Sequence, residues 1–123
     1  LSHQQLDDII DYCLRSGIDG IVAGNTTRSR DGITSISKEK IEAIGNGGMS
    51  GAPLYSKNLE LVKYVHAKSE GKLPIIGVGG IMSPEQAKEM MDAGASLVEI
   101  YSGFIYEGPA LIKNINKHLE NTL

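Results

Sequence analysis

Two glycine turns in the second half of the sequence have residues suited to binding a phosphate. Gly79-Gly80 follows the apolar segment 75–78, and Ser102-Gly103 follows the segment 96–101. Glycine has no Cβ, so the backbone N–H groups around it can approach a ligand closely. Such N–H groups, together with the start of a following helix, often bind phosphate in proteins. The alternative is that these glycines only permit tight turns.

A second candidate site is the polar pair Asn25-Thr26, which directly follows the apolar segment 19–23. Asparagine presents both a donor and an acceptor, which suits a planar amide or a ring that carries a carboxylate. An Asn/Thr turn that caps the following segment explains the same residues equally well. The sequence therefore leaves both interpretations open.

The segment 47–54, GGMSGAPL, contains three glycines and one proline. This composition predicts a fixed, irregular backbone path close to something flat or bulky. A flexible surface loop is the simpler explanation of the same composition.

The remaining reactive side chains do not form a recognisable catalytic or metal site. No pair among His3, His66 and His118 has the spacing of metal ligands. Cys13 lies on the apolar face of an expected helix, which favours a packed thiol over a nucleophile. We therefore predict no metal site and no catalytic residue within this sequence.

Helix and strand signals alternate along the chain. Ser2 with Gln5 has the pattern of a capping box, and Ser83-Pro84 with Gln86 is a strong helix start. The helices are expected between 2 and 17, at 55–70, at 83–94 and from about 109, and the strands at 19–23, 74–78 and 96–101. The second strand is expected to be buried on both faces because it is almost entirely apolar. A long polar connection over 28–53 leaves room for one short helix.

This alternation predicts an α/β fold with a parallel sheet and right-handed crossovers. In a (β/α)8 TIM barrel, phosphate is bound by the loops after strands 7 and 8. Three strands are fewer than half of the eight that a closed barrel needs. We therefore expect residues 1–123 to be the C-terminal three βα units of one TIM-barrel domain, with the N-terminal half absent. The start at Leu1, with no initiator methionine, fits that expectation.

Composition is that of an ordinary globular domain. The 123 residues are 41% hydrophobic and 22% charged, with a net charge of −3. This charge gives no reason to expect nucleic acid or an anionic membrane as a partner. A single cysteine excludes an internal disulfide framework and fits a reducing compartment.

Four ordered motifs together resemble the dihydroorotate dehydrogenase family. They are IVAGNTT at 21–27, GGMSGAPL at 47–54, PIIGVGGI at 74–81 and AGASLVEIYSGFIYEGP at 93–109. The second and fourth motifs are similar to the quinone-linked (class 2) branch. This resemblance implies an FMN-binding barrel in pyrimidine synthesis, which oxidises dihydroorotate to orotate and passes the electrons to a quinone.

The resemblance also implies roles for individual residues. The residues expected to contact FMN are Gly51, Gly80, Tyr101 and Ser102, and those expected to hold the substrate are Asn25 and Thr26. One position departs from the family, because Gly24 stands where a threonine that faces the flavin is usual. This departure puts one flavin contact in doubt.

The family's serine base, its flavin-side lysine and its N-terminal membrane element are all expected before Leu1. The chain is then a soluble fragment that binds and positions ligands, and its parent associates with the cytoplasmic side of a membrane. A different phosphate-binding flavin barrel is an alternative. A further alternative is an isolated, inactive chain that self-associates through the unpaired edges of its sheet.

Overall fold

The computed structural model describes residues 1–122, and the predicted helix starts form within it. Helix α1 (His3–Ser16) follows Ser2, whose Oγ accepts a hydrogen bond from the Gln5 backbone N at 3.2 Å. The Gln5 side chain accepts the return bond from the Ser2 N at 2.8 Å, which completes the capping box. Helix α4 (Pro84–Asp92) begins in a similar way, with Ser83 accepting from the Gln86 N. These local signals are confirmed.

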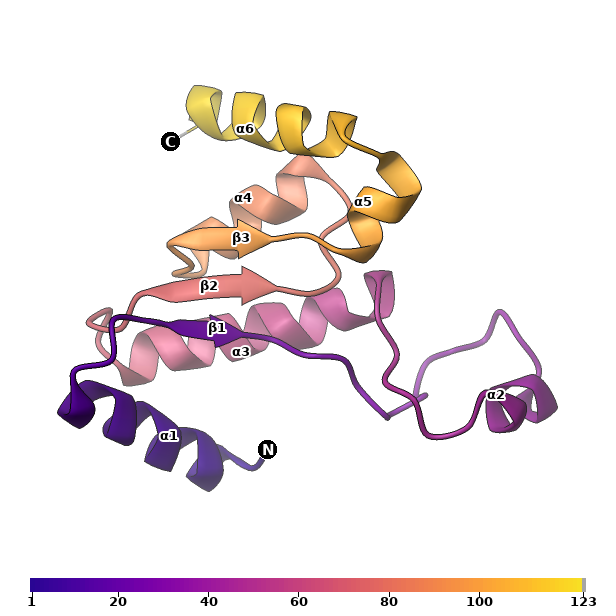
Figure 1. The fold of residues 1–123 in the computed structure, drawn as a ribbon, viewed down its shortest axis with the longest axis horizontal. Helices are drawn as coiled ribbons and strands as arrows, with labels where there is room; N and C mark the ends of the chain where they lie inside the picture. Colours follow the sequence, from indigo (N-terminus) through magenta and orange to yellow (C-terminus); the bar gives the residue numbers. More distant parts are fainter. Residues whose placement is uncertain (123) are drawn as a thin grey trace.

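Three short parallel strands form one sheet in the order β1-β2-β3 (Figure 1). They are β1 (Ile21–Ala23), β2 (Ile75–Val78) and β3 (Leu97–Glu99), each shorter than the sequence predicted. Ala23 pairs with Gly77, and Val78 pairs with Glu99. Because the strands are parallel, all three carboxyl ends meet at one edge of the sheet. This arrangement confirms the predicted α/β fold.

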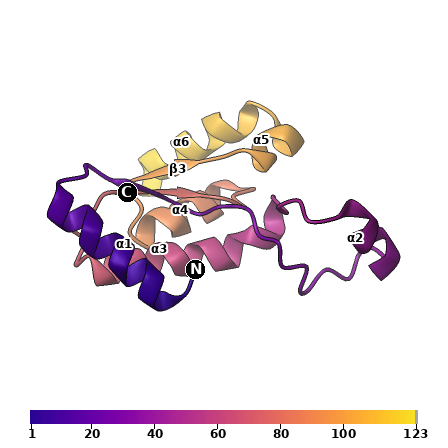
Figure 2. The same cartoon turned by 60° about the horizontal axis from the view of Figure 1, so that its bottom comes forward.

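Helices cover one face of the sheet. α3 (Tyr55–Lys68) packs on β1 and β2, α4 packs on β3, and α6 (Ala110–Thr122) packs on α4. Helix α1 lies against α3 (Figures 1 and 2). The buried core lies between these helices and the sheet, and it includes Ile10, Cys13, Leu59, Val62, Val65, Ile75, Ile81, Ala87, Met90, Leu111 and Ile115. Cys13 is therefore a packed thiol, as predicted.

The opposite face of the sheet is open. Val22 and Leu97 are 53% and 61% exposed, and Ile76 and Val78 on β2 are only half-buried. The expectation that β2 is buried on both faces is therefore wrong for this structure. Its apolar pattern suits two covered faces, but within residues 1–122 helices cover only one.

The long connection between β1 and α3 contains the one short helix that the sequence allowed, α2 (Lys38–Ile44). In both views α2 projects away from the rest of the chain, and none of its residues is buried (Figures 1 and 2). A 3-10 turn, η1 (Ala52–Leu54), then leads directly into α3. No helix within residues 1–122 has both the length and the apolar character needed to cross a membrane.

Helix α5 (Ser102–Glu107) was not predicted. Ser102 and Gly103 were expected in a glycine turn, but they are the first two residues of this helix. Tyr101 stands just before the helix in a conformation that is neither helical nor extended, with φ of −130° and ψ of −76°. The start of α5 still leaves bare N–H groups at this position, because the first N–H groups of a helix have no partner inside it.

Candidate functional site

A cavity of about 340 Å³ lies where the three strands end. Its lining comes from the segments after β1, β2 and β3 and from the glycine-rich segment 47–54. All six residues singled out in the sequence line it: Asn25, Thr26, Gly51, Gly80, Tyr101 and Ser102. A volume of this size is in the usual range for sites that bind small molecules. The structure therefore brings both predicted residue groups to one site.

The Gly79-Gly80 turn fits tightly against the start of α3. Both residues have positive φ, at 107° and 84°. A Cβ on Gly80 would lie 2.6 Å from the Tyr55 Cα and 2.8 Å from the Tyr55 Cβ, which is closer than atoms can pack. Glycine is thus required here both by the backbone conformation and by the neighbouring helix. Packing alone explains its identity, as the alternative interpretation of these turns held.

Helix α5 is held equally close to the β2–α4 connection. A Cβ on Gly103 would overlap the Ile81 carbonyl oxygen. This close approach places the start of α5 beside the Gly79-Gly80 turn, and residues of both segments line the cavity. The Ser102 hydroxyl also faces the glycine-rich segment, because its Oγ lies 3.1 Å from the Ser50 Oγ.

The segment 47–54 follows a fixed path with several contacts. Met49 and Thr27 form a short antiparallel bridge, with N to O distances of 3.1 and 2.7 Å. Arg30 donates to the Thr27 carbonyl at 3.0 Å and also to the Gly47 carbonyl. These bonds hold the segment against the end of β1, so the irregular path predicted for it is observed.

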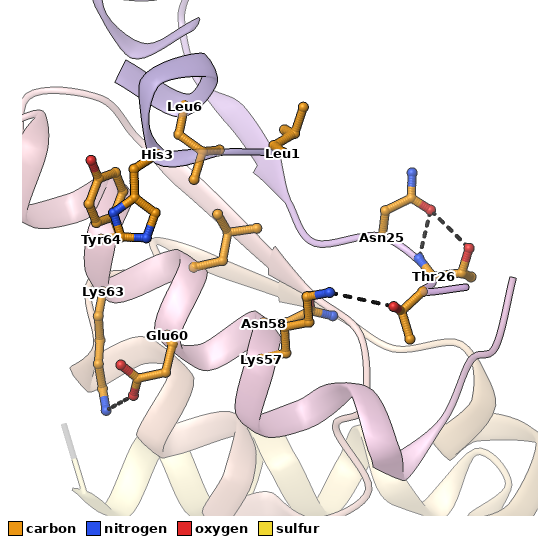
Figure 3. A pocket seen from close by; sticks show the side chains of 12 residues that line it. Leu1, His3, Leu6, Asn25, Thr26, Lys57, Asn58, Glu60, Lys63 and Tyr64 are labelled. Atoms are coloured by element: carbon orange, nitrogen blue, oxygen red, sulfur yellow. Dashed lines mark hydrogen bonds and ion pairs between the residues drawn. The ribbon is translucent and has the colours of Figure 1, made fainter. Parts of the chain in front are cut away.

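Asn25 and Thr26 are exposed and contact each other. The Asn25 Oδ1 accepts from the Thr26 backbone N at 2.7 Å and lies 3.4 Å from the Thr26 Oγ1 (Figure 3). This is the local Asn/Thr turn that the sequence allowed. The turn occupies one lone pair of Oδ1 and leaves the Asn25 side-chain NH₂ as a donor at the cavity. The turn interpretation of this pair is therefore confirmed, and the ligand interpretation stays a prediction.

Gly24 precedes this turn and leaves no room for a side chain. Its φ is 125°, and a Cβ would overlap the Val78 carbonyl oxygen and lie 3.1 Å from the Asn58 amide. A threonine, the residue that the sequence resemblance implies at this position, therefore does not fit this backbone. Any contact from this position to a ligand in the cavity therefore comes from the backbone of Gly24.

A second, larger cavity of about 620 Å³ shares Asn25 and Thr26 with the first. It lies between the start of α1 and the first half of α3 (Figure 3). Lys57 is at its edge, with its Nζ 3.4 Å from the Thr27 Oγ1. The His3 ring packs on Tyr64 at a centroid distance of 4.7 Å. Tyr64 in turn donates to Asp7, which joins α1 to α3.

A strong electrostatic contact lies beside the site, at the start of α3. Burial, and then a hydrogen bond of 2.6 Å to Glu89, raise the pKa of Tyr55, so its hydroxyl stays protonated. This bond ties the start of α3 to α4 beneath the Gly80 turn. Within residues 1–122 no group of three His, Cys, Asp or Glu side chains could hold a metal ion.

Two residues near the site were missed in the sequence. Glu99, at the end of β3, is the charged residue among those that line the 340 Å³ cavity. Its place two residues after Leu97, on the open face of the sheet, is the period-2 signal that could have found it. Asn58 is buried, and its spacing of four residues from both Leu54 and Val62 places it on the buried face of α3.

Comparison with known proteins shows the family. The family model of dihydroorotate dehydrogenase matches residues 1–123. A relative from Christiangramia forsetii, "Dihydroorotate dehydrogenase (quinone)", is 48% identical over 97% of this chain and 34% of its own length. One with the same name from Salinispora arenicola is 43% identical over 92% of the chain and 33% of its length.

A solved structure of ligand-free type dihydroorotate dehydrogenase from Eimeria tenella has a TM-score of 0.87 at 34% identity. It is matched over 98% of this chain and 33% of its own. The chain thus spans about a third of the length of the relatives that it matches. On the match of the family model along its whole length, this chain belongs to the dihydroorotate dehydrogenase family.

Proposed function

We propose that these residues supply the phosphate and substrate contacts of an FMN-dependent dihydroorotate dehydrogenase that uses a quinone. The observation that carries the proposal is the convergence of six residues, from four separate segments, on one cavity. The names of the relatives support this reaction and this acceptor. The whole protein is proposed to be a single TIM barrel, to which residues 1–123 give the last three βα units.

The cavity has features that suit FMN. Backbone N–H groups of the Gly79-Gly80 turn and the first residues of α5 surround one side of it, with hydroxyls from Ser50 and Ser102. Bare amides and hydroxyls are groups that bind phosphate without a lysine or arginine. The Tyr101 side chain is 76% exposed and offers an aromatic surface to a flat ring. When bound, FMN would accept a hydride from dihydroorotate and pass electrons to the quinone.

The substrate is proposed to lie at the Asn25-Thr26 turn. The Asn25 NH₂ group can donate to a carboxylate or ring carbonyl, and the Thr26 hydroxyl can both donate and accept. The Asn25 Oδ1 accepts a hydrogen bond from the Thr26 backbone N, which holds the Asn25 side chain against the turn before the substrate arrives. The role of these residues is to orient the ring, and the proton-abstracting serine is proposed to come from another part of the barrel.

The test uses the full-length gene product. Purified protein should contain FMN and oxidise dihydroorotate with a short-chain quinone faster than with fumarate or NAD. Absence of flavin, or activity only on another substrate, would support a different flavin barrel. Because quinones dissolve in lipid, we also propose that the full-length protein binds membranes. Co-sedimentation of the protein with lipid vesicles would measure this binding.

A matched pair of variants tests the phosphate contacts. Gly80→Val should lose most of the bound FMN, because the added side chain would overlap the start of α3 and distort the turn. Gly47→Val is the control, since nothing lies within 4 Å of a Cβ at that position. Full retention of FMN in Gly80→Val would contradict the assignment.

The 123-residue chain on its own is proposed to be inactive and to self-associate. Within residues 1–122, β1 and β3 each pair on one side only, and Val22 and Leu97 are exposed on the open face. Unpaired edges and exposed apolar side chains favour pairing with another chain. Light scattering should show oligomers. A monodisperse monomer with stoichiometric FMN would overturn this second proposal.

A further inference from the structure

Asn58 is a buried polar residue that does not line the 340 Å³ cavity. It lies in the first half of α3, and only 3% of it is exposed. Its Nδ2 is buried and has no hydrogen-bond partner among the described residues. Proteins retain few such donors, because each one costs free energy in the folded state. A donor kept in this position therefore needs a reason other than packing.

The Asn58 amide lies between the two turns of the proposed site. A Cβ on Gly24 would be 3.1 Å from both the Cγ and the Nδ2 of Asn58, and a Cβ on Gly79 would overlap Nδ2. Gly24 directly precedes the Asn25-Thr26 turn that is proposed to hold the substrate (the substrate turn). Gly79 is the first residue of the Gly79-Gly80 turn that is proposed to hold the phosphate (the phosphate turn). Figure 3 shows Asn58 on α3, facing the segment that carries Asn25 and Thr26. One side chain thus touches the backbone of both turns.

The neighbouring residue Lys57 lies in a different environment from Asn58. Lys57 is exposed, and its Nζ already has a partner in the Thr27 Oγ1 at 3.4 Å. The Asn58 amide is instead enclosed by glycines whose missing Cβ atoms make room for it.

We propose that Asn58 is a positioning residue for the substrate turn. Its side chain sets the separation of the Gly24–Thr26 and Gly79-Gly80 turns, and Nδ2 donates to the backbone of the substrate turn when substrate is bound. The inference rests on the proposed function, which places the substrate at Asn25 and Thr26. An apolar side chain with the same number of heavy atoms would keep the turns apart but could not donate. Leucine at position 58 therefore separates positioning from packing.

The experiment compares the full-length gene product with its Asn58→Leu and Asn114→Leu variants. Asn114 is an exposed residue of α6 and controls for the change of residue type. The readouts are FMN content, the Tm without substrate, the Kd of orotate from the flavin absorbance change, and kcat and KM for dihydroorotate. Wild-type protein without FMN or without dihydroorotate oxidation would refute the proposed function, and this inference with it.

If the wild type is active, Asn58→Leu should have an unchanged or higher Tm and unchanged FMN content. Its orotate Kd and dihydroorotate KM should rise about tenfold, which is ~1.4 kcal/mol and the scale of one hydrogen bond, with kcat little changed. Asn114→Leu should match the wild type throughout. An unchanged orotate Kd in Asn58→Leu, or a lower Tm with parallel loss of FMN and orotate, would overturn the proposal.

Asn58→Asp provides a second test if the leucine variant does not fold. Aspartate has nearly the same shape as asparagine but donates only when its carboxyl is protonated. Orotate binding by this variant should therefore be weak at neutral pH and recover as the pH falls. A flat pH profile at wild-type affinity would overturn the proposal.

Discussion

Replacing Gly80 with alanine tests the tightest contact in the candidate site. The added Cβ would meet backbone and side-chain atoms of Tyr55 at 2.8 Å or less, and the φ of 84° is one that L-residues rarely adopt. The conformational term costs about 1–2 kcal/mol. The overlap with α3 costs about 1–3 kcal/mol more, because the helix backbone cannot rotate away as a side chain would. We therefore expect Gly80→Ala to lower the free energy of unfolding by about 2–5 kcal/mol.

Three other glycines separate these two terms. Gly17 has a φ of 70° with nothing within 4 Å of its Cβ position, so Gly17→Ala should show the conformational term alone. Gly103 has no positive φ, but its Cβ would overlap the Ile81 carbonyl oxygen, so Gly103→Ala should show the steric term alone. Gly47 has neither feature, and Gly47→Ala should change stability by less than about 0.5 kcal/mol.

Urea unfolding of the four variants, in the full-length gene product without added ligand, measures the order. The expected order of destabilisation is Gly80, then Gly103, then Gly17, then Gly47. If Gly80→Ala costs no more than Gly17→Ala, the contact between the Gly79-Gly80 turn and α3 is not as described. The explanation of Gly80 by packing would then fail.

Three further predictions concern the contacts that surround the site. The hydrogen bond from Tyr64, and then that from Lys68, lower the pKa of Asp7 in the folded protein. Ionised Asp7 therefore stabilises the fold at pH values above its unfolded-state pKa. This contribution is lost as the pH falls through the lowered folded-state pKa. Thermal unfolding of Asp7→Asn should differ from wild type at pH 7 and converge with it at acid pH. Tyr55→Phe removes the hydroxyl bond to Glu89 and should cost about 1 kcal/mol in urea unfolding, whereas Tyr106→Phe, at an exposed site, should cost nothing measurable. Arg30→Met removes the bonds to Thr27 and Gly47 and should speed proteolysis within residues 28–48, whereas Arg28→Met should not.

Local signals predicted much of this fold because the physics behind them is local. The Ser2 and Ser83 caps form with the expected partners, since capping depends on residues only three apart. Helix α5 was missed for the opposite reason. It is six residues long and begins Ser-Gly, and Gly103 is needed because the helix packs on the Ile81 carbonyl. That contact joins residues 22 positions apart, and no window of sequence shows it.

The candidate site was predictable to a similar extent. Parallel strands bring their carboxyl ends together, so the sequence alone predicts Asn25, Gly80 and Ser102 at one edge of the sheet. Asn58 could not be predicted there, because a polar residue in a helix is usually exposed. Its burial depends on the gap between Gly24 and Gly79, which exists only once β1 and β2 have paired.

The glycines of the site also change how the sequence motif should be interpreted. Gly24, Gly79, Gly80 and Gly103 are each required by a neighbouring protein atom, so their presence alone does not demonstrate a phosphate site. Gly51 differs, because a Cβ there would meet Ser102 only at an ordinary 3.7 Å. Packing makes the turns glycine-rich, and glycine turns in turn leave bare N–H groups at the edge where the strands end. The feature that indicates a ligand site is therefore the convergence of these turns with Asn25 and Thr26 on one cavity, rather than the number of glycines.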